Sequence, residues 1–168
     1  MHSANAIGVW TADWLWGLVM ITATVVLHAT GLGLIALTLM RLHGRVVVDR
    51  HERPVAFIFS FAIVVGLAAL LLAVLHGIEA MLWAACYLAL GAMPNIPDAV
   101  YFSLAMMSTS GADVTALQPH WKLMGTLEAV GGMLLFGLST AFLFAVLVRI
   151  MPMTDRDGTG TNGARPVD

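Results

Sequence analysis

Three long stretches with almost no charged residues constrain this chain more than any other feature. Residues 14–40 and 55–78 contain no Asp, Glu, Lys or Arg, and residues 123–150 contain only Glu128 and Arg149. About 20 apolar residues in a helix cross the ~30 Å hydrocarbon core of a bilayer. Because 60% of the chain is hydrophobic and 11% is charged, little remains for a soluble domain. The sequence therefore predicts an all-α membrane protein with three transmembrane helices.

The loop after the first stretch sets the expected orientation. It carries four arginines within 13 residues: Arg41, Arg45, Arg50 and Arg53. Short loops rich in Lys and Arg stay on the cytoplasmic side. We therefore expect a multi-pass protein with its N-terminus outside and, since Arg149 follows the third stretch, its C-terminus in the cytoplasm.

A shorter segment between the second and third stretches cannot be a span. Pro97 and Asp98 suit the first turn of a helix that runs to about Thr109. Such a helix covers only about 18 Å, well below the ~30 Å of the bilayer core. The small, polar residues 108–113 follow, and non-helical backbone at membrane depth has to be buried in protein or line water. We predict a re-entrant pore helix and filter loop.

The stretch from residue 83 to 147 resembles the small bacterial ion-channel proteins of the two-transmembrane potassium-channel pore superfamily. The family's filter reads Thr-Thr-Leu-Gly-Tyr-Gly-Asp, whereas this chain reads Ser-Thr-Ser-Gly-Ala-Asp. Thr109 and Gly111 match, Ala112 takes the Tyr position, and either Asp113 replaces the second Gly or one residue is deleted. The resemblance implies a homotetrameric cation channel in the bacterial inner membrane, with a degenerate filter that is weakly selective or not potassium-selective.

The division of the chain follows from these elements. Residues 1–53 hold the first helix and the Arg-rich loop, residues 54–151 form the potassium-channel-like pore domain, and residues 152–168 are polar and Gly-rich, which predicts a disordered cytoplasmic tail. The predicted selectivity filter consists of Ser108, Thr109, Ser110, Gly111, Ala112 and Asp113. A ring of Asp113 carboxylates would attract monovalent cations, or alternatively divalent ones.

Two glutamates and several glycines in the spans are further candidates. Glu79 and Glu128 lie at the outer level, where they either support the filter through hydrogen bonds or reach headgroup water. Gly131 and Gly132 favour close helix packing, and Gly137 is a candidate gating hinge in the pore-lining helix.

His28 and His76 raise the alternative of a metal or haem site. Counting about 1.5 Å per residue from Trp14 and from Pro54 puts the two histidines at different depths, so we expect no metal and no cofactor. The chain lacks enzyme motifs and a basic patch, which argues against an enzyme and against nucleic acid as a partner. A non-conducting accessory membrane subunit remains the alternative function.

The orientation is testable by thiol labelling of intact cells. A cysteine in place of His43 should react only after the membrane is permeabilised, because the Arg-rich loop holds it inside, and one in place of Asn95 should react from outside. The unchanged chain, with Cys86 alone, is the control. The reverse pattern would remove the basis of the pore-loop prediction.

Overall fold

The computed structural model describes residues 2–46, 54–111, 113 and 116–150 of the chain. Most of the Arg-rich loop, the predicted filter residue Ala112 and the predicted tail from residue 152 lie outside this part.

Every regular element of the described residues is a helix, which confirms the predicted fold class. The elements are α1 (His2–Val46), α2 (Pro54–Ala89), α3 (Ile96–Met107), the 3₁₀ turn η2 (Pro119–Trp121) and α4 (Lys122–Ile150). Three segments are long and apolar enough to cross a membrane: Thr11–Arg41, Val55–Ala89 and Pro119–Arg149. They coincide with the three predicted spans, and α3 is the short helix expected between the last two.

Local capping sets the ends of α2 and α3. Gly91 follows α2 with a φ of +65° and donates to the Leu88 carbonyl, while the Ala92 N–H donates to the Tyr87 carbonyl. This is a Schellman termination, in which a glycine adopts the left-handed conformation after the last turn. Asn95 then caps α3, because its side chain accepts a 3.0 Å hydrogen bond from the Asp98 N–H. The chain thus turns sharply from α2 into a helix of a different direction.

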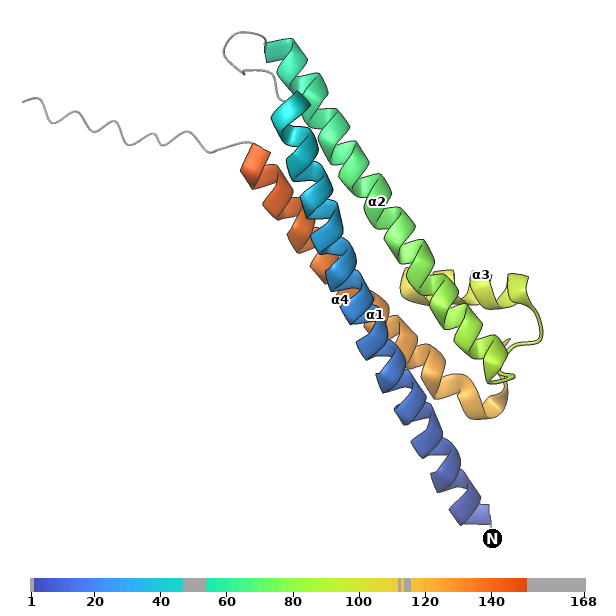
Figure 1. Ribbon diagram of the computed structural model, residues 1–168. Helices are drawn as coiled ribbons and strands as arrows, with labels where there is room; N and C mark the ends of the chain where they lie inside the picture. The colour runs from blue at the N-terminus through green and yellow to red at the C-terminus, as the bar shows by residue number, and fades with distance from the viewer. Residues whose placement is uncertain (1, 47–53, 112, 114–115, 151–168) are drawn as a thin grey trace, which may run out of the picture.

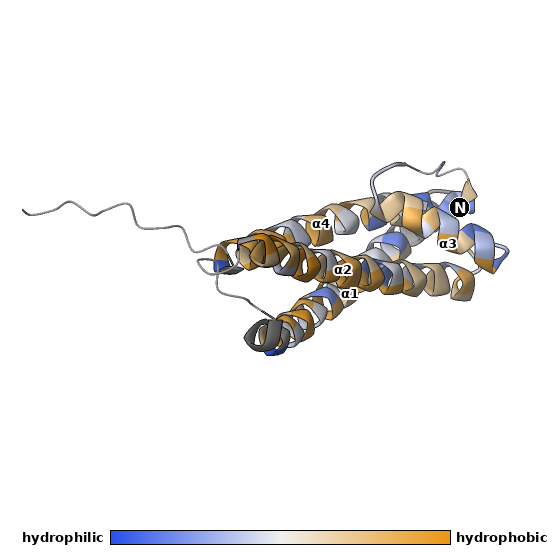
Figure 2. Cartoon of the chain, turned by 90° about the horizontal axis from the view of Figure 1, so that it is seen from above, coloured by the Kyte–Doolittle hydropathy of each residue, from blue (hydrophilic) through white to orange (hydrophobic). Residues whose placement is uncertain are grey.

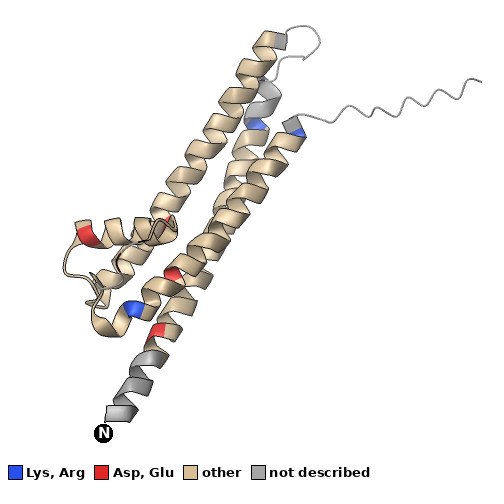
Figure 3. Cartoon of the chain, turned by 180° about the vertical axis from the view of Figure 1, so that it is seen from behind, with Lys and Arg blue, Asp and Glu red and all other residues tan. Residues whose placement is uncertain are grey.

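α1, α2 and α4 form an elongated bundle, and α3 lies across the C-terminal half of α2 (Figure 1). Hydrophobic residues cover most of the three long helices (Figure 2), and large side chains such as Leu15, Phe59 and Leu70 are more than 60% exposed. Charged residues are sparse along the bundle, with arginines at the end away from α3 (Figure 3). An apolar exterior of this kind faces lipid or neighbouring subunits.

The larger of the two cores surrounds α3. It joins Trp83 and Tyr87 of α2, Phe102 and Met106 of α3, and Met124 of α4. The Tyr87 and Phe102 rings meet edge to face with centroids 5.6 Å apart. A second core has only aliphatic residues at its buried centre, where α1 packs against α2, and side chains of α4 such as Phe142 pack against it. The re-entrant helix is therefore held by the most aromatic part of the bundle.

Glycines let α4 approach its neighbours, as the packing interpretation of Gly131 and Gly132 predicted. A Cβ on Gly132 would lie 2.7 Å from the Cα of Met107, at the end of α3. A Cβ on Gly131 would lie 3.3 Å from Cγ1 of Ile21 on α1. Only a residue without a side chain allows the backbones of α3 and α4 to come so close.

Gly132→Ala should destabilise the folded protein by about 1–3 kcal/mol, because the new methyl group overlaps backbone that cannot rotate away. Gly66→Ala is the matched control, since a Cβ there meets no heavy atom of the described chain within 4 Å. Alanine is also the better helix former, so this control should be unchanged or up to about 1 kcal/mol more stable. Reversible unfolding in detergent, followed by circular dichroism, measures both. Equal stability of the two variants would contradict the close α3–α4 contact.

Candidate functional site

The short helix α3 packs one face against the bundle and ends at Met107, beside α4. α3 has 12 residues, and its buried face, which includes Phe102, Ser103 and Met107, packs between α2 and α4. Its first turn carries Asp98 and its last turn carries no basic residue. The negative end of the helix dipole therefore points to the segment that follows, without a nearby cation on the helix to neutralise it.

The predicted filter begins with an abrupt change of backbone conformation. Thr109 has a φ of +57° and Gly111 a φ of +81°. Glycine adopts such a conformation readily, but a β-branched residue in it costs of order 1–3 kcal/mol, and such strain concentrates at functional sites. Ser108 and Ser110 turn back to the helix end, where each hydroxyl donates to the Ala105 carbonyl at 3.2 Å. Residues 108–111 thus leave α3 as an ordered, non-helical segment.

Asp113, predicted to ring the outer mouth, has an exposed side chain. Its backbone carbonyl accepts a 2.9 Å hydrogen bond from the Ala116 N–H.

Glu128 is the buried centre of the module formed by α2, α3 and α4. Its carboxylate is fully buried and accepts from the Tyr87 hydroxyl at 2.7 Å and from the Ser103 hydroxyl. Each of the three helices contributes one side chain to this group. The carboxylate therefore ties the re-entrant helix to both neighbouring spans, which is a different contact from the predicted bond to the filter backbone.

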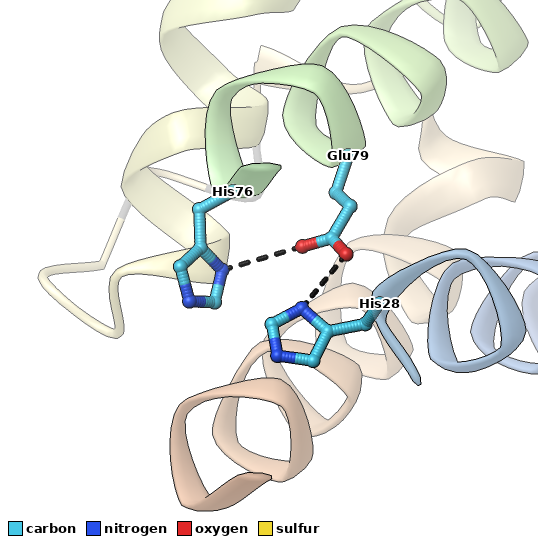
Figure 4. Close-up of side chains that lie close together, drawn as sticks. All are labelled: His28, His76 and Glu79. Atoms are coloured by element: carbon cyan, nitrogen blue, oxygen red, sulfur yellow. Dashed lines mark hydrogen bonds and ion pairs between the residues drawn. The ribbon is translucent and has the colours of Figure 1, made fainter. Parts of the chain in front are cut away.

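Glu79 is the centre of a second buried group, which joins α1, α2 and α4. His28 Nδ1 lies 2.9 Å from Glu79 Oε1, and His76 Nδ1 lies 3.3 Å from Glu79 Oε2. Both imidazoles turn toward the carboxylate (Figure 4). On the other side of the rings, Ser139 Oγ lies 3.1 Å from His28 Nε2 and 3.0 Å from His76 Nε2. The four side chains close a polar ring, which we call the Glu79 ring.

The Glu79 ring corrects the depth estimate for the histidines. Counting from Trp14 and Pro54 separated His28 from His76, yet their ring centroids are 5.1 Å apart. The count failed because both helices are longer than the bilayer is thick: α1 has 45 residues and α2 has 36. Neither starting residue marks the membrane boundary, so distances counted from them do not give a common depth.

An open groove lies on the face of α4 that points away from α1. Its volume is about 670 Å³, and it is bounded by Thr109 together with Met133, Gly137, Thr140 and Phe144. A Cβ on Gly137 would meet no heavy atom of the described chain within 4 Å. The groove thus begins at the predicted filter and follows α4 past the candidate hinge.

Sequence reasoning missed several of these polar partners. Tyr87, Ser103 and Ser139 did not stand out, because single hydroxyls are common in membrane helices and often bond their own backbone. The available signal was the position of Glu79 and Glu128 in apolar spans, since a buried carboxylate needs hydrogen-bond donors. The position of these glutamates predicts that hydrogen-bond donors lie nearby but does not identify which residues supply them.

Comparison with known proteins supports the class of protein. Residues 72–149 match the family model described as "Ion channel". The match covers the C-terminal half of α2, all of α3, and α4 up to Arg149. No curated protein and no solved structure matches the chain. The matched segment contains α3, the residues of the predicted filter and Glu128.

The role of Glu128 in linking α2, α3 and α4 is testable by substitution. Glu128→Leu should cost about 2–4 kcal/mol of stability, because two buried hydroxyls lose their acceptor at roughly 1–3 kcal/mol each. Glu128→Gln retains a carbonyl oxygen and should cost about 1 kcal/mol. A double-mutant cycle with Ser103→Ala, measured by unfolding in detergent, should give a coupling energy of at least about 1 kcal/mol. Additive effects would contradict the contact.

Proposed function

We propose that this chain forms a cation-conducting pore in which several copies, four by resemblance to the potassium-channel superfamily, surround a common axis. The observation that carries the proposal is the re-entrant helix α3, which ends between two spans and continues as the positive-φ segment at Thr109 and Gly111. One chain supplies one such segment, so a central pathway needs several copies. The family match over residues 72–149 supports the same class.

The groove along α4 gives the proposed pore a lining. Its residues are exposed in the single chain, and Thr109 connects it to the filter. Copies arranged with this face inward would enclose a cavity below the filter, in which Thr109 and Thr140 supply polar atoms. We propose that α4 is the pore-lining helix and that Gly137 is the hinge at which it bends.

The charge arrangement favours cations over anions. The C-terminal end of α3 presents the negative end of its dipole to residues 108–113, and Asp113 adds a carboxylate. We propose residues 108–113 as the filter and expect weak discrimination between potassium and sodium. Ala112 and Asp113 stand where the family has Tyr and Gly, so fewer ordered carbonyl rings are available to replace the hydration shell.

Glu128 supports this filter indirectly in our proposal. It holds α3 through Ser103, and α3 in turn sets the position of Thr109. Glu79 does not support the filter in our proposal, because its partners are the two histidines of the Glu79 ring.

The expected location is the bacterial inner membrane, with the α3 end of the bundle facing outside. Arg41 and Arg149, near the C-terminal ends of α1 and α4, lie at the opposite end and support this orientation.

Ion flux through liposomes that contain the purified protein tests the proposal. Cation flux should exceed anion flux, with potassium and sodium passing at similar rates. Asp113→Asn should reduce cation flux severalfold at ~0.01 M salt, where the Debye length is ~30 Å, and change little at ~1 M, where it is ~3 Å. The variant should keep the wild-type oligomer mass, which we expect to be that of a tetramer.

The gain-of-function control restores the family's filter by Ala112→Tyr with one inserted Gly before Asp113. This variant should prefer potassium. A stable monomer without flux would favour the accessory-subunit alternative, and strong potassium selectivity of the unchanged chain would overturn the account of the filter.

A further inference from the structure

We infer that His28, His76 and Glu79 form a binding site for a divalent transition-metal ion, with Zn²⁺ as the expected occupant. The site joins α1 to α2 and lies outside the predicted filter. The inference does not depend on whether the protein conducts ions.

The ligand atoms already converge. One ligand atom from each of the three side chains lies within 4.8 Å of the other two. His28 Nδ1 lies 2.9 Å from Glu79 Oε1, and His76 Nδ1 lies 3.3 Å from the other carboxylate oxygen, Oε2. Ligands bound to zinc at ~2.0–2.2 Å in a tetrahedron stand about 3.4 Å apart. Side-chain shifts of up to about 1.4 Å would bring the widest of these separations to the tetrahedral value and open the centre of the group for an ion.

Ser139 can accept the hydrogen bond that a metal-bound histidine has to donate. When Nδ1 of an imidazole binds a metal, the remaining hydrogen sits on Nε2 and needs an acceptor. Ser139 Oγ lies within 3.1 Å of both Nε2 atoms, and a hydroxyl oxygen has two lone pairs. One residue of α4 can thus orient both imidazoles.

The side chains of the Glu79 ring have too few hydrogens for all of their polar contacts, which indicates that a cation is missing from the ring. With Glu79 ionised and both imidazoles neutral, the Glu79 ring has four polar contacts but only three hydrogens, one from each histidine and one from Ser139. The contact left without a hydrogen is the 3.3 Å contact between His76 Nδ1 and Glu79 Oε2, because Oε2 is buried and accepts no hydrogen bond within the described part of the chain. A metal ion bound to both Nδ1 atoms and to the carboxylate would satisfy this oxygen.

The residue types select the class of ion. Two imidazoles with one carboxylate suit Zn²⁺ and its first-row neighbours, whereas Mg²⁺ and Ca²⁺ prefer oxygen ligands alone. Haem does not fit, because a bis-histidine haem holds its imidazoles on opposite faces of a porphyrin, while these rings share one carboxylate and one hydroxyl. The His76 side chain is 25% exposed in the single chain, so it is the one member of the group that is not fully covered.

The experiment uses the full-length protein without a polyhistidine tag, in detergent, after removal of metals by chelation. The other four histidines, which are His2, His43, His51 and His120, are first replaced by Gln, so that only His28 and His76 remain. This background should bind one Zn²⁺ per chain by elemental analysis after dialysis. Co²⁺ should give the visible absorption of a tetrahedral site, and Zn²⁺ should displace it.

Substitutions separate ligands from positioning residues. His28→Gln, His76→Gln and Glu79→Gln should each weaken Zn²⁺ binding at least about 100-fold, while Ser139→Ala should weaken it about 10–100-fold, as expected for an outer-shell partner. His76→Cys supplies a new ligand, so it should bind Co²⁺ and add a thiolate-to-cobalt charge-transfer band. This rescue also shows that position 76 can be changed without loss of folding.

Two outcomes would overturn the inference. One is stoichiometric Zn²⁺ binding that survives His28→Gln together with His76→Gln, which would place the ion elsewhere. The other is a folded background protein that binds no Zn²⁺ or Co²⁺ at micromolar concentration, in which case a proton alone closes the Glu79 ring.

Discussion

The structure depends on one constraint, which is that backbone within the membrane has to find hydrogen bonds inside the protein. The three long helices meet it by themselves. The segment that begins at Asn95 cannot, because α3 is too short to span and residues 108–111, which follow it, are not helical. Other parts of the chain have to cover this segment, and the larger core of the bundle covers the buried face of α3.

Two contacts hold α3 against α2 and α4. The Glu128 carboxylate accepts hydroxyl hydrogens from α2 and α3, and Gly132 lets α4 pass against the backbone of Met107. The first is a polar contact in an apolar setting, where an unsatisfied group would be costly, and the second is a steric fit. Both act at the C-terminal half of α3, next to Thr109, whose φ is +57°.

The Glu79 ring is a second group of polar contacts between helices, and it connects α1 to the segment that matches the channel family. His28 is the residue that α1 contributes, whereas the other members belong to α2 and α4. His28, Glu79 and Ser139 are buried, so their polar atoms depend on one another and on His76 for hydrogen bonds. α1 is thereby held to the channel-like part of the chain by a specific polar contact in addition to aliphatic packing against α2.

The sequence by itself determined the three spans, the short re-entrant helix and the unusual residues that follow it. These features depend on the lengths of apolar stretches and on local breakers such as Gly91 and Pro97, which can be read along the chain. The tertiary structure alone decided that Glu128 meets Tyr87 and Ser103, and that His28 lies beside His76. Such side-chain contacts depend on how far each helix is rotated about its axis and shifted along it. A shift of one residue turns a side chain by about 100° around the helix. Because the helices are longer than the bilayer, counting from their ends cannot supply that register.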